Sequence, residues 1–138
     1  MSFLIAVHVN EGIVLASDRK TTYTNTLTLP NGKIIKRIGI HNTTSTDKTF
    51  ICPNKAGVCA CGDASIKNKP ITGFIRDMII NKISEDTAIG DMPQIIIDYF
   101  NNLDEIPNSN FIVAGYSNIE ATQEQIIYKV RLKKKEIE

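Results

Sequence analysis

Cysteine and histidine are the residues of this chain that could most directly hold a metal ion. Cys52, Cys59 and Cys61 lie close together, whereas His8 and His41 lie far from them in the sequence. A structural zinc site needs four ligands at short spacings, and an odd, clustered set of cysteines does not suit the disulfide framework of a secreted protein. We therefore interpret the cysteines as small buried apolar residues and expect no metal and no cofactor. His8 stands in an apolar run, which favours a buried core histidine.

The first residues of the chain carry a different pattern. Ser2 is followed by an apolar run at 3–9, a turn at Gly12, a second apolar run and then Asp18. Residues 2–18 (SFLIAVHVNEGIVLASD), with the following RKTT, resemble the opening of proteasome β-subunits and their bacterial relatives HslV and Anbu. These proteins are N-terminal nucleophile (Ntn) hydrolases. Ser2 falls at the position of the nucleophile, Gly12 at the turn and Asp18 at the family's aspartate, with no gap.

Two further segments carry the resemblance. The family has a catalytic lysine before one strand and an oxyanion glycine at the end of the next, and Lys48 and Gly62 stand at that interval, 14 residues apart. The longer stretch between Asp18 and Lys48 would be filled by a hairpin turning at Pro30-Asn31-Gly32. Lys33 is the rival lysine, since it lies nearer the usual distance from Asp18, but no matching glycine follows it. The sequence FIVAGY at 111–116, after two helices, is similar to the family's central strand.

The resemblance implies a peptidase mechanism. Ser2 would attack the peptide bond after loss of Met1, with its own α-amino group as the base, because that group titrates near neutral pH. Lys48 would favour the alkoxide, Asp18 would orient Lys48, and the backbone N–H of Gly62 would bind the oxyanion. The substrate would be a peptide or an unfolded protein.

Three more residues are expected to touch the substrate. Thr22 matches a family threonine whose backbone pairs with an extended peptide by strand addition. Ala60 and Ala64 map beside the pocket for the residue before the cut, and both are small, which predicts a roomy pocket.

Ordinary alternatives stand beside these assignments. Asp18 and Gly62 could be turn residues and Lys48 a solvated charge. The family's later glycine-serine motif and closing strands have no counterpart, so a catalytically inactive structural or assembly subunit is the alternative function. A third possibility is an Ntn hydrolase acting on a small amide.

The pattern of elements predicts an α+β fold. We expect strands at 3–9, 13–16, 49–52, 57–61, 111–115 and 126–130, and two consecutive helices beginning near Pro70 and Asp91. Because the run at 3–9 is almost continuously apolar, we expect that strand to be buried on both faces. The resemblance implies an αββα-type Ntn-hydrolase sandwich of antiparallel sheets with a helical layer, incomplete at its C-terminal end. We expect one domain over 1–138, with an inserted hairpin at about 24–47, a polar loop at 41–47 and a charged, solvated tail at 131–138.

Composition limits the partners. The 138 residues are 42% hydrophobic and 22% charged, with a net charge of +1, which argues against nucleic-acid and anionic-membrane binding. The run at 3–9 is too short for a membrane span or a signal peptide, so a soluble cytoplasmic protein is expected. The resemblance also implies a homo-oligomeric ring and an ATP-dependent unfoldase partner.

Overall fold

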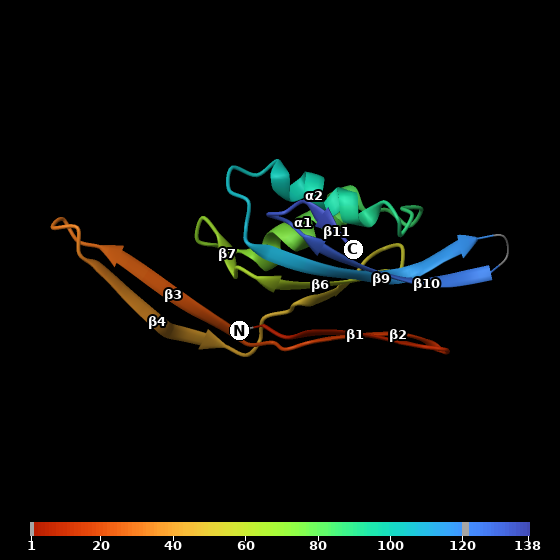
Figure 1. The fold of residues 1–138 in the computed structure, drawn as a ribbon, viewed down its shortest axis with the longest axis horizontal. Helices are drawn as coiled ribbons and strands as arrows, with labels where there is room; N and C mark the ends of the chain where they lie inside the picture. The colour runs from red at the N-terminus through yellow and green to blue at the C-terminus, as the bar shows by residue number, and fades with distance from the viewer. Residues whose placement is uncertain (1, 120–121) are drawn as a thin grey trace.

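A central antiparallel sheet carries helices on one face and a separate two-stranded hairpin on the other (Figure 1). The computed structural model describes residues 2–119 and 122–138, with the backbone alone at 24–25, 37–42 and 118–119. Helix and antiparallel strand together confirm the α+β class. No helix in the described part of the chain is long and apolar enough to cross a membrane.

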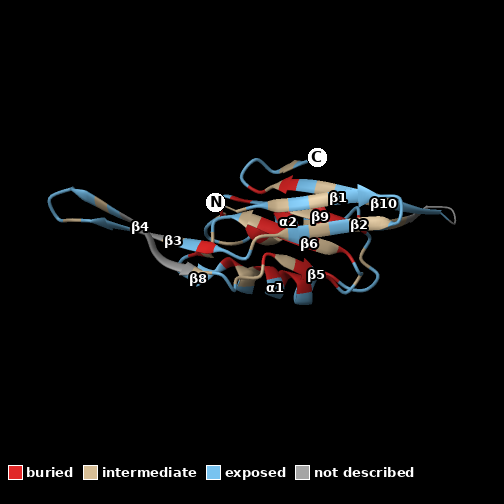
Figure 2. Cartoon of the chain, turned by 90° about the horizontal axis from the view of Figure 1, so that it is seen from below, coloured by how far each residue is buried: buried red, intermediate tan, exposed pale blue. Residues whose placement is uncertain are grey.

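The central sheet has five strands in the order β11-β10-β9-β6-β5. Its face toward the helices carries the core of the molecule, because Val58 and Ala60 of β6 and Phe111 and Val113 of β9 are buried in the same apolar cluster as the helices. Figure 2 colours the buried parts of these elements red. The bounds are β5 (Thr49–Ile51), β6 (Gly57–Gly62), β9 (Ser109–Ile119), β10 (Thr122–Arg131) and β11 (Glu136–Ile137).

Two helices cover this face. Apolar residues recur at helical spacing in α1 (Ile71–Lys82) and α2 (Met92–Asn101), and these residues pack on the sheet. Pro70 and Asp91 are the residues that precede the helices, as the sequence predicted. A short hairpin, β7 (Ser65–Ile66) with β8 (Lys69–Pro70), leads into α1 and was not predicted.

The opening hairpin, β1 (Leu4–Val9) with β2 (Gly12–Ser17), lies on the opposite face of the central sheet (Figure 1). The prediction that its first strand is buried on both faces is wrong. Ile5, Val7 and Val14 are 37%, 44% and 57% exposed, because no described element covers the outer face of the hairpin. His8 is also exposed rather than a core histidine.

The second hairpin projects from the body as an arm, formed by β3 (Thr21–Thr28) and β4 (Ile34–Thr43) (Figure 1). The turn lies at Pro30-Asn31-Gly32, as predicted, with Gly32 at φ 77°. Residues 41–43 belong to β4 rather than to a polar loop, because they pair with Thr21–Tyr23 beyond an irregularity in the register after Tyr23.

The C-terminal segment is not a solvated tail. Residues 136–137 form β11, which pairs with the end of β10 and so adds an edge strand to the central sheet. Leu132 is 1% exposed, and its N–H donates to the carbonyl of Ser109. The burial of Leu132 and the pairing of β11 therefore hold this charged segment against the central sheet.

Candidate active site

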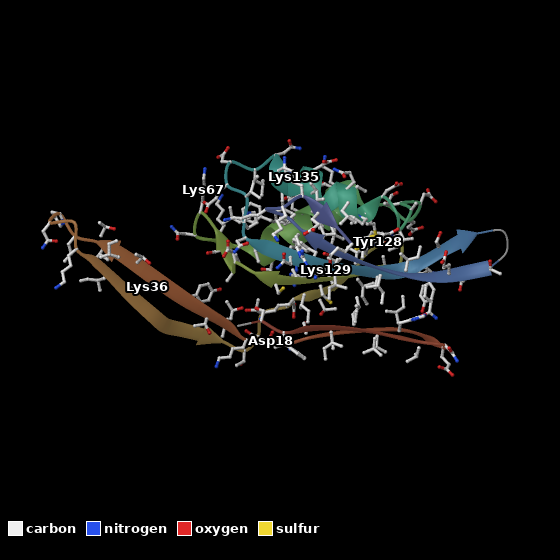
Figure 3. All side chains as sticks on the ribbon, in the orientation of Figure 1. Asp18, Lys36, Lys67, Tyr128, Lys129 and Lys135 are labelled. Atoms are coloured by element: carbon white, nitrogen blue, oxygen red, sulfur yellow. The ribbon has the colours of Figure 1, made fainter. Side chains whose placement is uncertain are left out.

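Asp18 lies where the opening hairpin ends and the arm begins (Figure 3). The N–H of Phe3 donates to Asp18 Oδ1 at 2.7 Å, and the N–H of Lys20 donates to Oδ2 at 3.0 Å. The N–H of Asp18 in turn donates to the carbonyl of Phe3. These bonds hold the first described residues of the chain against the end of β2, and Ser2 is thereby placed next to Asp18.

Lys48 connects Ser2 and Asp18, at the end of the opening hairpin, to the central sheet. It directly precedes β5, and its carbonyl accepts the N–H of Ala60 on β6. Lys48 is 8% exposed. Its Nζ lies 2.9 and 3.0 Å from the two carboxylate oxygens of Asp18, 2.6 Å from the carbonyl oxygen of Lys20 and 3.1 Å from Ser2 Oγ. The structure thus brings Ser2, Asp18 and Lys48 together.

The bonding of Lys48 defines the chemistry it can perform. An ammonium group has three donors and no acceptor, and these donors meet a carboxylate, a carbonyl and the Ser2 hydroxyl oxygen. Because Lys48 donates to Ser2 Oγ, the hydroxyl proton of Ser2 can point elsewhere, toward a base. Lys48 is therefore placed to stabilise negative charge on Ser2 Oγ.

The same contacts lower the pKa of Asp18 below its usual value. The largest cause is the hydrogen bond from the Phe3 N–H, followed by the bond from Lys48. Partial burial acts in the opposite direction and is outweighed. Asp18 is therefore a carboxylate at neutral pH and counters the charge of Lys48.

Gly62 ends β6 in a conformation that requires glycine. Its φ is 119°, and a Cβ at this position would collide with the backbone of Asn108 and Ser109. The next residue holds that backbone in place, since the Asp63 carboxylate accepts the N–H of Asn108 and the Asp63 N–H donates to the Asn108 carbonyl. A side chain at position 62 would therefore displace the neighbouring strand.

The direction of the Gly62 N–H follows from strand alternation. Residues two apart in a strand direct their N–H groups to the same edge. The Ala60 N–H points to Lys48, so the Gly62 N–H points to this same edge of β6. β5 begins only at Thr49, so Gly62 lies beyond the start of that strand.

A cavity of about 80 Å³ lies beside these groups. It is lined by Ser2, Lys48 and Gly62 and by all three predicted substrate-binding residues, Thr22, Ala60 and Ala64. Asp18 is not part of the lining, but it bonds to two lining residues, the side chain of Lys48 and the backbone N–H of Lys20. The remaining lining residues are Lys20, Thr21, Thr46, Asp47, Cys61, Asp63, Ile71, Thr72, Ile75 and Ser109.

Lys33, the alternative lysine, lies elsewhere. It is an exposed residue of the turn between β3 and β4, at the far end of the arm. Lys48 is thus the lysine that contacts Ser2.

Several lining residues had no sequence signal. Asp47 accepts hydrogen bonds from Arg19 and Arg76, at 3.0 Å each, and so links the rim of the cavity to α1. Ser109 precedes the predicted strand at 111–115, and a single serine outside any motif gives no indication of a site. The burial of Ser109 is what identifies it.

The described residues include three free cysteines and no cluster of metal-ligand side chains. No group of three His, Cys, Asp or Glu side chains there could hold a metal ion. Cys52 and Cys59 are buried free thiols, and Cys61 is a partly exposed one.

No family model, curated protein or solved structure matches this chain.

Proposed function

We propose that this chain is an N-terminal nucleophile hydrolase of the proteasome and HslV type that cleaves peptide bonds with Ser2. The observation that carries the proposal is the 3.1 Å contact from Lys48 Nζ to Ser2 Oγ, with Lys48 held by Asp18. In this interpretation the β1–β2 hairpin belongs to the second sheet of an αββα sandwich.

The first chemical step is attack on the scissile carbonyl. After Met1 is removed, the free α-amino group of Ser2, with a pKa of about 7.7–8.0 in peptides, takes the proton from Oγ. Oγ bonds to the carbonyl carbon, and the electron pair moves to the carbonyl oxygen. Lys48, donating to Oγ, lowers the energy of the negative charge that develops there.

The second step is loss of the amine. The Gly62 N–H, on the cavity edge of β6, donates to the tetrahedral oxyanion. The C–N bond then breaks as the leaving nitrogen takes the proton from the Ser2 amine. Water, deprotonated by the same amine, hydrolyses the Ser2 ester and restores the hydroxyl.

The test compares proteins that begin at Ser2 with proteins that retain Met1. We expect intact mass spectrometry to find one adduct of a β-lactone on Ser2 only when Met1 is absent, and a panel of peptides and small amides to be cleaved by the same form. Ser2→Ala should lose both signals. Lys48→Met should slow labelling by roughly 10²–10³-fold, the effect of removing an electrostatic group from a reacting oxygen.

Lys33→Met is the matched control, because it removes the other candidate lysine from an exposed turn. It should label like the unchanged protein. If the protein beginning at Ser2 forms no adduct and cleaves nothing in the panel, the peptidase proposal is wrong and a structural or assembly role takes its place. Cleavage of small amides alone would assign the site to another Ntn branch.

A further inference from the structure

Ser109 is a buried polar residue that the proposed mechanism does not use. It is the first residue of β9, lies opposite Gly62 and is 2% exposed. Its carbonyl accepts the N–H of Leu132, but its Oγ has no hydrogen-bond partner among the described residues. A buried hydroxyl without a partner costs free energy, and Ser109 lines the cavity beside Ser2.

Strand alternation shows which way the hydroxyl faces. Ser109, Phe111 and Val113 lie on one face of β9, and Phe111 and Val113 belong to the core beneath the helices. The cavity opens on this same face, since buried residues of α1 line it. The Ser109 hydroxyl thus lies on the side of the sheet that forms the cavity floor.

The cavity lining also includes three buried apolar residues. Ala60, Ile71 and Ile75 are 5%, 8% and 1% exposed. A protein cavity of about 150 Å³ holds benzene, which is roughly 25 Å³ for each heavy atom. The cavity of about 80 Å³ therefore takes a side chain of about three heavy atoms, and an aromatic side chain is too large. The predicted roomy pocket is a small one.

We infer that Ser109 is a specificity-determining residue, and that the cavity selects a small hydroxyl-bearing side chain, threonine or serine, next to the bond that is cut. The inference rests on the proposed function. Threonine and valine have the same shape, but only threonine offers the Ser109 hydroxyl a partner inside an apolar floor.

Cleavage of paired peptides tests this inference. We expect the protein beginning at Ser2 to cleave after threonine with a kcat/KM roughly tenfold higher than after valine, and to cleave poorly after phenylalanine. Ser109→Ala should remove the preference for threonine over valine while still cleaving after valine. Ser117→Ala, which removes a hydroxyl from the same strand outside the cavity lining, should keep the preference.

A binding measurement decides the case in which the protein cleaves nothing. N-acetyl-threonine amide and N-acetyl-valine amide would be titrated while the backbone N–H signals of Ala60 and Ala64 are followed by NMR. Tighter binding of the threonine compound, lost in Ser109→Ala, supports the inference even if the peptidase proposal fails. Equal cleavage and equal binding of the threonine and valine compounds by the unchanged protein would overturn the inference. A preference for threonine that survives in Ser109→Ala would also overturn it.

Discussion

The two faces of the central sheet are held to their neighbours in different ways. Between the sheet and the helices, Met78, Phe100 and Phe111 are completely buried. Between the sheet and the β1–β2 hairpin, the contacts include a chain of polar groups, in which Ser17 Oγ lies 2.7 Å from Thr49 Oγ1, itself 3.3 Å from Cys59 Sγ. Most of the buried apolar side chains of the described residues therefore lie on the helix side.

The candidate site lies across this boundary. Gly62 ends β6 and Lys48 directly precedes β5 of the central sheet, whereas Ser2 and Asp18 lie just outside the two strands of the hairpin. Ser2 is thus carried by the layer with more exposed side chains, and Lys48 joins the two layers at the site through its contacts with Ser2 and Asp18. Substitutions in the two layers should separate stability from site geometry.

The largest effect is expected on the helix side. Phe100→Ala removes a fully buried ring that contacts Phe111, and it should lower the free energy of unfolding by about 3–5 kcal/mol. Val14→Ala, on the exposed face of the hairpin, should change it by about 0.5 kcal/mol or less. Urea denaturation measures both. Equal losses would show that the hairpin face is covered in solution.

An intermediate effect is expected at the corner between the layers. Asp18→Asn keeps the shape of the side chain but leaves the buried Lys48 without its countercharge, so the free energy of unfolding should fall by about 2 kcal/mol at neutral pH. Because folding lowers the pKa of Asp18, its stabilisation is present above about pH 4, the ordinary aspartate range, and is lost as the pH falls through the lower folded pKa.

Urea denaturation from neutral to acid pH checks this sign. The unchanged protein and Asp18→Asn should converge in stability as the pH decreases below about 4. Asp104→Asn is the control, since Asp104 pairs with Lys67 at the exposed surface. A difference between Asp18→Asn and the unchanged protein that persists in acid would assign the effect to packing rather than to charge.

The smallest effect is expected within the polar chain. Thr49→Val removes the hydroxyl that lies between Ser17 and Cys59, and it should cost about 1 kcal/mol. The measurement is again urea denaturation, together with the rate of β-lactone labelling of Ser2. Unchanged stability would show that the chain contributes little to holding the hairpin.

Much of the element order could be predicted because it is encoded locally. Helical spacing of apolar residues marked α1 and α2, and Pro30-Asn31-Gly32 marked the turn of the arm. The family resemblance implied that Lys48 and Gly62 share a site, and both line the cavity, because the antiparallel strands β5 and β6 bring the chain back to the end at which Lys48 stands.

Other features depend on tertiary structure and could not be predicted. β1 is apolar at nearly every position, so its sequence does not distinguish the covered face from the exposed one. Leu132 is a single apolar residue among lysines, and only its contact with β9 shows that it is buried. Ser109 is identified by its burial and by a hydroxyl that has no hydrogen-bond partner among the described residues, and neither property has a sequence pattern.

The arm is connected directly to the cavity through the start of β3. Thr21 and Thr22 lie at the cavity and also begin β3, whose pairing continues outward to the turn at Asn31. A fluorescent label at Asn31 would stand in the turn of the arm, far from the cavity but joined to it by the strand that begins at Thr21. Any rotation of the arm on ligand entry would thus become a change in fluorescence anisotropy, with no probe inside the site.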